Sequence, residues 1–297
     1  MKKQYILILG CGYVGKKIAQ ACLAENMQIL ACTRSKDHAE ELQDLGIPAL
    51  VCQSPDKLPH HLLQQITHLI DSIPLTRKGE SMFASQFHFI PILTPKLTSL
   101  QWVAYLSTTG VYGDAKGAWV NENSTCQPQS ERGKQRLLAE KFWLESGLPA
   151  EVFRLAGIYG QERNIIPRLM AGDYKAIAWQ PEHYSSRVHV DDIVRTLMAA
   201  MHQPRAGRIL NVADDLPLPH HQYVQQVAAM IGAPAPIILT PEEGKVQLSA
   251  TVLSFFGDNK RICNQQLHHE LLPVLQYSNF QSGITHILQY MSKHKSK

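Results

Sequence analysis

The stretch ILILGCGYVGKKIA, residues 6–19, decides the fold of this 297-residue chain. It begins with an apolar run, passes through three glycines spaced G-x-G-x-x-G, and continues with Val14 and Ile18 four residues apart. An apolar run ended by glycine is typical of a buried strand, and the four-residue interval is typical of a helix. The pattern therefore predicts a strand over Tyr5–Leu9, a tight turn, and a helix over about 15–25.

Each of the three glycines has a position where a side chain would interfere. Gly10 makes the turn, Gly12 lets the backbone approach a pyrophosphate, and Gly15 lets the helix pack close to the strand. The helix N-terminus then presents unpaired N–H groups and the positive end of its dipole to the phosphates. We therefore expect a dinucleotide site, with a tight turn that binds no ligand as the alternative. The predicted phosphate loop consists of Gly10, Cys11, Gly12, Tyr13, Val14 and Gly15.

The end of the second predicted strand, 28–32, indicates which dinucleotide binds. A protein that selects NAD usually has Asp or Glu there, but this chain continues with Thr33, Arg34 and Ser35. An acid would repel a 2′-phosphate, whereas Arg34 with its two hydroxyl neighbours would bind it through charge-assisted hydrogen bonds. The sequence thus predicts NADP over NAD. The alternative is that Arg34 is an ordinary surface residue.

The alternation of strands and helices continues through the first half of the chain, which is typical of a parallel sheet covered on both faces. We predict an α/β fold, a doubly wound parallel sheet of the Rossmann type with a smaller C-terminal α/β part. A helical stretch over 81–99 contains Pro91 and Pro95, which should kink or break it. Further strands are predicted at 49–52, 68–73, 102–107, 151–155 and 208–212. Further helices are predicted at 35–45, 132–147, 220–232 and 279–292.

Composition excludes several classes of protein. The net charge is only +4, and the one basic cluster is the C-terminal KHKSK, so no nucleic-acid partner is expected. Six cysteines without a Cys-x-x-Cys pair predict free thiols in a reducing compartment. Three adjacent histidine pairs lack ligand-like spacing, so no metal is expected. The N-terminal apolar run is too short for a signal peptide or a membrane span, which predicts a cytoplasmic protein.

Five later motifs occur in a characteristic order. They are STTGVYG at 107–113, FRLAGIYG at 153–160, RVHVDDI at 187–193, NVADD at 211–215 and KRICN at 260–264. Together with the glycine loop, this set resembles the extended short-chain dehydrogenase/reductases, the NAD(P)-dependent epimerase/dehydratase family, over nearly the whole chain. In RVHVDDI, we expect Asp191 or Asp192 to cap the helix that follows.

The resemblance implies two domains that interleave along the chain. A Rossmann domain of residues 1–157 plus 184–214 would bind NAD(P), and a small domain of residues 158–183 plus 215–297 would bind the substrate. The predicted cofactor site also includes Ser72, Ile73, Pro74 and Ser107 at the ends of two strands. A homodimer is a further option.

The resemblance also implies a catalytic Ser or Thr, a Tyr and a Lys. Thr108 matches the hydroxyl that binds the substrate oxygen, but the run SERGKQRLLAE places Arg132 where Tyr is expected and Arg136 where Lys is expected. A guanidinium stays protonated, so Arg132 cannot transfer the proton, whereas Arg136 could donate to the nicotinamide ribose. Lys134 is offset by two residues and would lie on another face of the helix.

No other residue of the sequence stands out as the missing acid or as a substrate anchor. Candidates for the acid are Tyr112, Tyr159, Glu162, His183 and Tyr184. Candidates for an arginine that binds a diphosphate are Arg163, Arg168, Arg187 and Arg261.

Two hypotheses about function follow. The chain is an NADP-dependent oxidoreductase, epimerase or dehydratase that acts on a small polar or sugar-like molecule, or it is a non-catalytic NADP-sensing regulator that binds a partner. The retained Thr108 favours the first hypothesis, and the loss of Tyr and Lys favours the second. The identity of the substrate does not follow from these residues.

Overall fold

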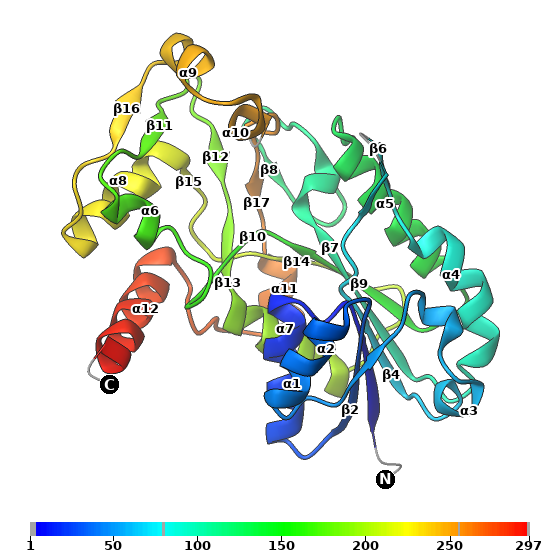
Figure 1. Ribbon diagram of the computed structural model, residues 1–297. Helices are drawn as coiled ribbons and strands as arrows, with labels where there is room; N and C mark the ends of the chain where they lie inside the picture. The colour runs from blue at the N-terminus through cyan, green and yellow to red at the C-terminus, as the bar shows by residue number, and fades with distance from the viewer. Residues whose placement is uncertain (1–3, 79–80, 255, 296–297) are drawn as a thin grey trace.

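Seven parallel strands form the central sheet, in the order β14-β9-β7-β4-β1-β2-β3 (Figure 1). The structure is a computed structural model that describes residues 4–78, 81–254 and 256–295. The order reverses between β1 and β4, which is the point where open α/β sheets bind their ligands. The strands of the sheet are β1 Tyr5–Leu9, β2 Gln28–Thr33, β3 Ala49–Val51, β4 His68–Asp71, β7 Trp102–Thr108, β9 Ala150–Leu155 and β14 Ile209–Val212.

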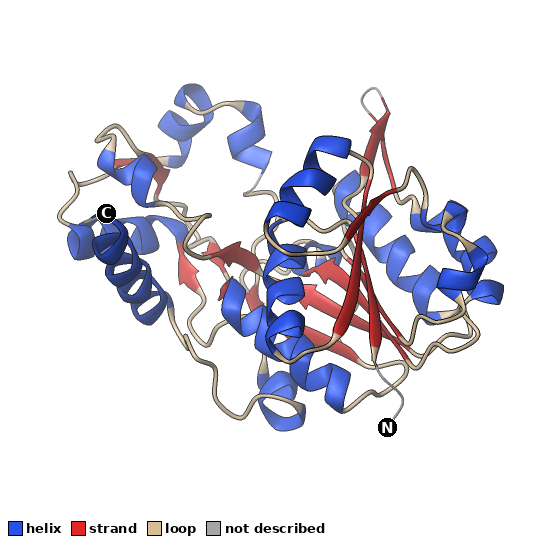
Figure 2. Cartoon of the chain, turned by 60° about the horizontal axis from the view of Figure 1, so that its bottom comes forward, coloured by secondary structure: helices blue, strands red, loops and turns tan. Residues whose placement is uncertain are grey.

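Helices cover both faces of the sheet (Figure 2). In β1, Ile6 and Ile8 pack in one buried cluster and Leu7 and Leu9 in another, because successive side chains of a strand point to opposite faces. The predicted doubly wound α/β fold is confirmed. On the first face lie α1 Tyr13–Ala24, α2 Lys36–Asp44, α7 Val190–His202 and α11 Gln265–Glu270. On the second face lie α3 His60–Leu63, α4 Gln86–Leu93 and α5 Glu131–Leu144.

A third apolar cluster lies beside the sheet and is called the α8–α12 cluster here. Its buried side chains come from Tyr159, α6, residues 174–176, α8 and α12. The helices and strands in this part are α6 Ile166–Met170, β11 Lys175–Ile177, β12 Tyr184–Ser185, β15 Leu218–Pro219, α8 His220–Ile231, β16 Ile237–Leu239, α9 Pro241–Gln247, α10 Ala250–Ser254 and α12 Phe280–Lys295. Between it and the sheet lie β8 Trp119–Val120, β10 Gly157–Tyr159, β13 Arg187–His189 and β17 Arg261–Ile262. The predicted domain boundaries stay a prediction. Two residues of the predicted small domain, Ile262 and Leu267, pack with the first face of the sheet.

The stretch 81–99 differs from its prediction. Residues Ser81–Phe83 form strand β6, which pairs with β5 Thr76–Lys78, so the helix starts only at Gln86. The helix α4 continues through Pro91 and ends at Leu93, and Pro95 lies in the short 3-10 turn that follows. The prolines thus shorten the helix without preventing it. Strand β4 also ends two residues before the predicted boundary, at Asp71.

The predicted cap of α7 was wrong. The cap is His189, whose Nδ1 accepts a hydrogen bond from the Asp191 amide at 3.2 Å. Asp192 lies inside the first turn, where its carboxylate accepts hydrogen bonds from the amides of Gln276 at 2.7 Å and Tyr277 at 2.9 Å. It also pairs with Arg195 at 2.9 Å. Asp192 therefore fixes a distant segment, the approach to α12, to the sheet.

A buried acid lies where the chain leaves the sheet after β14. The Asp214 amide donates to the carbonyl of Arg187 at 2.6 Å, and Asp214 Oδ1 accepts from the Leu216 amide at 3.3 Å. Its other oxygen, Oδ2, has no hydrogen-bond partner among the described residues. Burial raises the pKa of Asp214 to about 7, although the nearby Arg187 guanidinium acts in the opposite direction.

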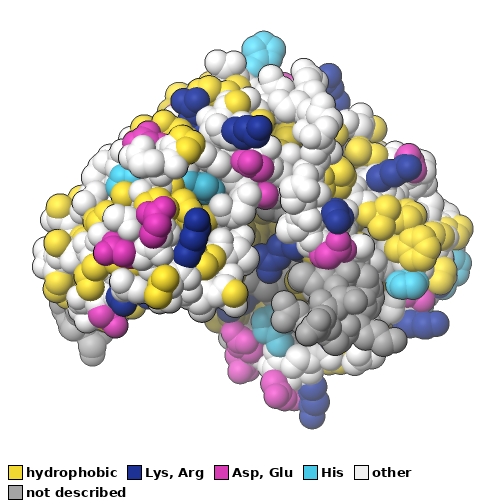
Figure 3. All heavy atoms as spheres, turned by 90° about the horizontal axis from the view of Figure 1, so that it is seen from above, with side chains coloured by type: hydrophobic (Ala, Val, Ile, Leu, Met, Phe, Trp, Pro, Cys, Tyr) yellow, Lys and Arg dark blue, Asp and Glu magenta, His cyan; other side chains and the backbone are white. Residues whose placement is uncertain are grey.

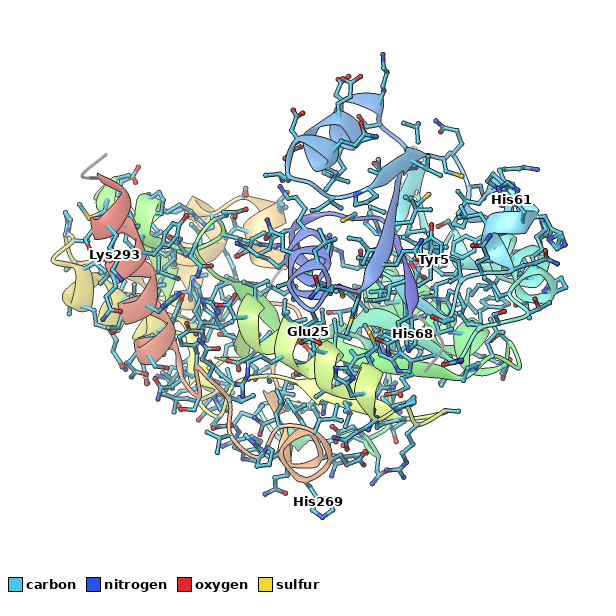
Figure 4. The ribbon with its side chains drawn as sticks, turned by 90° about the horizontal axis from the view of Figure 1, so that it is seen from below. Tyr5, Glu25, His61, His68, His269 and Lys293 are labelled. Carbon is cyan, nitrogen blue, oxygen red and sulfur yellow. The ribbon has the colours of Figure 1, made fainter. Side chains whose placement is uncertain are left out.

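The histidines and cysteines are dispersed. Figure 4 shows His61 and His269 at separate edges of the molecule, pointing outward. Within the described residues, no group of three His, Cys, Asp or Glu side chains could hold a metal ion. All six cysteines are free thiols. No helix in the described ranges has both the length and the apolar character needed to cross a membrane.

A buried ion pair fixes the strand ends on which the candidate site is built. Arg154 of β9 donates from Nη2 to Glu140 of α5 at 2.8 Å and from Nε at 3.2 Å. The Ser107 hydroxyl donates to the same carboxylate. On its other side, Arg154 donates to the Tyr112 hydroxyl at 3.0 Å, which donates to Asn211 at 2.7 Å. This network therefore connects α5 with β7, β9 and β14.

We expect Glu140→Gln to lower the free energy of unfolding by about 3–5 kcal/mol, because it leaves Arg154 buried without its counter-charge. Urea denaturation measures the loss. The control is Glu145→Gln on the same helix, which removes an exposed pair with Lys141 and should change stability by less than about 1 kcal/mol. Equal effects of the two substitutions would contradict this account of the network.

Candidate functional site

Two cavities meet at the glycine loop after β1. Cavity A, of ≈ 370 Å³, lies over the ends of β1, β2 and β3, and cavity B, of ≈ 630 Å³, lies over the ends of β1, β4, β7 and β9. Both are lined by Gly10, Gly12 and Pro74, so they adjoin one another across the loop. Figure 3 shows a hollow on this side of the molecule, with basic side chains inside it.

Every residue predicted for cofactor binding or catalysis lines one of these cavities or both. In cavity A they are Gly10, Cys11, Gly12, Thr33, Arg34, Ser35, Ile73 and Pro74. In cavity B they are Gly10, Gly12, Tyr13, Val14, Gly15, Ser72, Pro74, Ser107, Thr108, Arg132 and Arg136. The structure thus brings together residues from five separate stretches of the chain. Their roles stay a prediction.

Gly10 is required by the backbone itself. Its φ is +70°, and a Cβ atom at this position would lie 2.9 Å from the Cα of Ile73. The turn is held from two sides, since the Gly10 amide donates to Cys32 at 3.0 Å and the Ser72 hydroxyl donates to the carbonyls of Leu9 and Gly10. The side chain of Ser72 therefore holds the loop and is not available to a ligand.

Gly12 is different, because none of the residues that the structure describes comes close enough to require a glycine there. Its φ is −81°, and a Cβ atom would meet only the Gly10 carbonyl, at 4.0 Å. The space beside Gly12 is open to both cavities. The first bond within α1 runs from the Lys16 amide to the Gly12 carbonyl at 2.8 Å, so the amides of Tyr13, Val14 and Gly15 have no partner within the helix. A dinucleotide's phosphates fit this bare surface.

Cavity A carries positive charge and hydroxyl groups. The Ser35 hydroxyl caps α2 by accepting from the His38 amide at 3.3 Å, and the Thr33 hydroxyl accepts from the Ser35 amide at 3.4 Å. The exposed Arg34 forms no ion pair with any described residue. None of the residues that line cavity A is Asp or Glu. This end of the site therefore suits an anionic group.

Sequence reasoning missed His38, which closes one side of cavity A. Its Nε2 lies 2.8 Å from the Cys11 carbonyl, and its Nδ1 lies 3.0 Å from Glu41 Oε2. Glu41 also accepts from Lys16 at 3.1 Å, so α2 is fastened to the start of α1. The position of His38 three residues after the cap was the only available signal, and it does not show where the ring points.

In cavity B, Arg136 is held by the protein. Its Nη1 lies within hydrogen-bond distance of the Tyr105 hydroxyl at 3.1 Å, the Ile73 carbonyl at 3.3 Å and the Leu106 carbonyl at 3.4 Å. The arginine at the expected lysine position thus joins the ends of β4 and β7. Whether its remaining N–H groups donate to a ribose stays a prediction.

Thr108 and Arg132 have groups that are available to a ligand. The Thr108 oxygen accepts from the Gly110 amide at 3.2 Å, which leaves its O–H to donate into cavity B. Arg132 is exposed at the first turn of α5, and its side chain has no hydrogen bond or ion pair with the described residues. Lys134 pairs with Glu131 at 2.9 Å and does not line cavity B, in line with its offset. Ser107 is committed to Glu140.

None of the five candidates for the missing acid lines cavity B. Tyr112 belongs to the Arg154 network, and Glu162 pairs with Lys17 at 3.2 Å. Tyr159 is buried in the α8–α12 cluster, and burial raises its pKa. Tyr184 donates to Glu182 at 2.9 Å. His183 lines a third cavity, of ≈ 660 Å³, and burial lowers its pKa.

One of the four candidate arginines, Arg163, lines cavity B. Arg168 lines the third cavity and lies over the Tyr174 ring. Arg187 is buried against the Tyr223 ring, 3.5 Å from its centroid. Arg261 lies against the rings of Trp119 and Tyr184. Only Arg163 is therefore placed to meet a ligand beside the glycine loop.

The glycine loop allows a matched pair of substitutions. We expect Gly12→Ala to leave the melting temperature almost unchanged and to lower the affinity for NADPH, because its Cβ would occupy the open space beside the helix N-terminus. Gly10→Ala should instead destabilise the fold by at least about 1–2 kcal/mol, the cost of a left-handed backbone for a residue with a Cβ. Thermal melts and calorimetric titration with NADPH measure both. Unchanged affinity in Gly12→Ala would contradict the fit.

Comparison with known proteins agrees with this architecture. No protein-family model matches the sequence. The chain is similar to protein YeeZ of Escherichia coli K12, with 27% identity over 281 residues that cover 89% of this chain and 94% of that protein. A dTDP-glucose 4,6-dehydratase from Bacillus anthracis, solved in complex with NAD, has a TM-score of 0.74 at 17% identity and covers 99% of this chain and 98% of its own. At that identity the likeness shows the fold alone.

A conserved protein of unknown function from Silicibacter pomeroyi is more similar. Its structure has a TM-score of 0.86 at 32% identity and covers 96% of this chain and 98% of its own. The order of the central strands, the glycine loop and the later motifs agree with the resemblance found in the sequence. The chain belongs to the same family as the Silicibacter pomeroyi protein, and it has the Rossmann fold of the extended short-chain dehydrogenase/reductases, that is, of the NAD-dependent epimerases and dehydratases.

Proposed function

We propose that this chain is an NADP-dependent reductase that transfers hydride to the carbonyl group of a small polar substrate. The observation that carries the proposal is the open space at Gly12, which lies beside unpaired helix amides and between two cavities. Since no packing contact requires a glycine at this position, the approach of a ligand is the remaining reason for one. The solved relatives that bind NAD agree with a dinucleotide there.

The two cavities fit the two ends of such a dinucleotide. The phosphates would lie against the amides of Tyr13, Val14 and Gly15, the adenosine would occupy cavity A, and the nicotinamide would enter cavity B. When bound, the nicotinamide supplies the hydride. In cavity B, the Thr108 hydroxyl would donate a hydrogen bond to the substrate oxygen and so hold the carbonyl carbon within reach of the hydride.

The groups in cavity B favour reduction over the other reactions of this fold. An epimerase or dehydratase that begins by oxidising a substrate alcohol must take the hydroxyl proton as the hydride leaves, which requires a positioned base. The ionisable side chains that line cavity B are three arginines and Tyr13, and burial raises the pKa of Tyr13 to about 12. Reduction needs no base, since the carbonyl carbon gains hydride and its oxygen gains a proton. We assign that proton to a water molecule, which becomes hydroxide in the solvent, while Thr108 keeps its own proton and only donates a hydrogen bond.

The preference for NADP rests on cavity A. A 2′-phosphate near Arg34 would meet a guanidinium that pairs with no other described side chain, the Ser35 hydroxyl and the N-terminus of α2. No carboxylate among the residues lining this cavity would accept from an unphosphorylated ribose. NADH would therefore lose the charged contacts and gain nothing in exchange.

Cofactor preference can be measured directly. We expect NADPH to bind at least about tenfold more tightly than NADH, and Arg34→Ala to remove most of this difference, because a charge-assisted hydrogen bond contributes about 1.5–3 kcal/mol. Isothermal titration calorimetry with both cofactors measures it. Arg205→Ala, which removes an arginine paired with Glu270 outside both cavities, is the control and should keep the preference. Equal affinity of the two cofactors would refute the preference for NADP.

Measuring turnover distinguishes the proposed reductase from the alternative function, an NADP-sensing regulator. Arg132 and Arg136 favour the regulator, because they replace the expected catalytic Tyr and Lys. With NADPH and a panel of small carbonyl compounds, we expect oxidation of NADPH at 340 nm, and Thr108→Val should lower kcat/KM about 10- to 100-fold through the lost hydrogen bond. Thr94→Val, outside both cavities, should not. Tight binding of NADPH without turnover of any compound would support the regulator instead.

A further inference from the structure

Cavity B has an unusual balance of charge for a site that binds an uncharged carbonyl compound. Three arginines line it, Arg132, Arg136 and Arg163, together with the two threonines Thr108 and Thr109. No Asp or Glu is among its lining residues. Arg136 joins the ends of β4 and β7 through its hydrogen bonds. Contacts within the described part of the protein do not explain the presence of the other two, Arg132 and Arg163.

The acids next to these two arginines are already paired with other residues. Glu131 precedes Arg132, but it pairs with Lys134 at 2.9 Å. Glu162 precedes Arg163, but it pairs with Lys17 at 3.2 Å. Neither guanidinium has an ion pair or side-chain hydrogen bond with another residue in the described part of the chain. The two neighbouring carboxylates, Glu131 and Glu162, are therefore paired with lysines and do not neutralise the arginines of cavity B.

The two arginines reach cavity B from different faces of the sheet. Arg132 is on α5, which covers the second face, and the first turn of α5 packs against the loop after Thr108, since Gly133 lies close to the Gly110 carbonyl. Arg163 follows β10 on a loop that packs near α1 on the first face, where Gly160 leaves room for the Tyr13 ring. A ligand in cavity B would thus meet a cation on each side.

From this arrangement we infer that the substrate carries an oxyanion group, a carboxylate or a phosphate, which Arg132 and Arg163 bind while Thr108 holds the carbonyl oxygen. The inference rests on the proposed function, because it names the substrate class of that site. Guanidinium groups bind carboxylates and phosphates through paired N–H donors, and a cavity without acids favours an anion throughout. At the position where a tyrosine would transfer a proton, Arg132 thus binds the anionic group of the substrate instead.

The same cations would assist the reaction. Hydride transfer to a carbonyl group places negative charge on its oxygen, and fixed positive groups near that oxygen stabilise the charge as it develops. Arg132 lies in the first turn of α5, which packs against the loop after Thr108, and both residues line cavity B, so Arg132 is placed to act on this charge as well as on the oxyanion.

The test compares charged probes with neutral ones that have the same carbon chain and carbonyl group. Protein saturated with NADP⁺, which cannot reduce the probes, is titrated with 2-oxo acids of three to six carbons and with their methyl esters. A second arm uses dihydroxyacetone phosphate and dihydroxyacetone, and it distinguishes a phosphate from a carboxylate. Saturation-transfer NMR detects even weak binding. We expect binding of the charged member of at least one pair and at least tenfold weaker binding of its neutral counterpart.

Arg132→Gln and Arg163→Gln should each weaken binding of the charged probe about 10- to 100-fold, with NADPH affinity kept within about twofold. Lys134→Gln removes one positive charge from the same helix outside cavity B and should leave binding unchanged. Equal binding of charged and neutral probes, or wild-type binding in both arginine variants, would overturn the inference. A loss of NADPH affinity in Arg163→Gln would show that Arg163 binds the cofactor, and would overturn the inference that Arg132 and Arg163 together bind the substrate.

The measurement of NADPH affinity comes first, and it separates the two proposals. A wild-type protein that does not bind NADPH contradicts the proposed function. A protein that binds NADPH but shows no preference for charged probes contradicts only the oxyanion inference and leaves the proposed reductase in place.

Discussion

The turn at Gly10 is held between three strands, and the rest of the site depends on it. Its amide bonds to the end of β2, and its carbonyl accepts from Ser72, which follows β4. The positive φ of Gly10 then directs the chain so that α1 begins at the boundary of the two cavities. Because the same turn adjoins both cavities, small shifts in it would move the adenosine end and the nicotinamide end of a bound dinucleotide together.

Arg154, Arg136 and Arg132 show three different ways in which the protein accommodates a guanidinium group near the strand ends. Arg154 lies behind the strand ends and is neutralised by Glu140. Arg136 is satisfied by a hydroxyl group and two carbonyls, which contribute no charge of their own. Arg132 has neither, and its charge is left to the solvent and to a ligand. A buried charge is costly unless it is paired. Accordingly, the buried Arg154 has a full counter-charge, the half-buried Arg136 has only neutral hydrogen-bond partners, and the exposed Arg132 has neither among the described residues.

Features encoded locally were readable from the sequence. The glycine spacing, the apolar runs of β1, β2 and β7 and the residue types after β2 each depend on a few neighbouring positions, and the structure places them as expected. Features that depend on distant partners were not. The bonds of Arg136 require the end of β4 to lie beside the end of β7, and Asp192 accepts hydrogen bonds from a segment more than eighty residues away. The ring of His38 reaches Cys11 only because the fold places α2 beside the glycine loop, where Glu41 also pairs with Lys16.

The buried carboxyl group of Asp214 makes the joint between the sheet and the α8–α12 cluster sensitive to acidity. In the folded chain its pKa is about 7, against an ordinary value of 3.8, so the folded chain keeps a proton that the unfolded chain releases. This contribution to stability is complete below about pH 4 and is lost as the pH rises through 7. A change of pH across this range therefore changes the charge that acts on the buried guanidinium of Arg187.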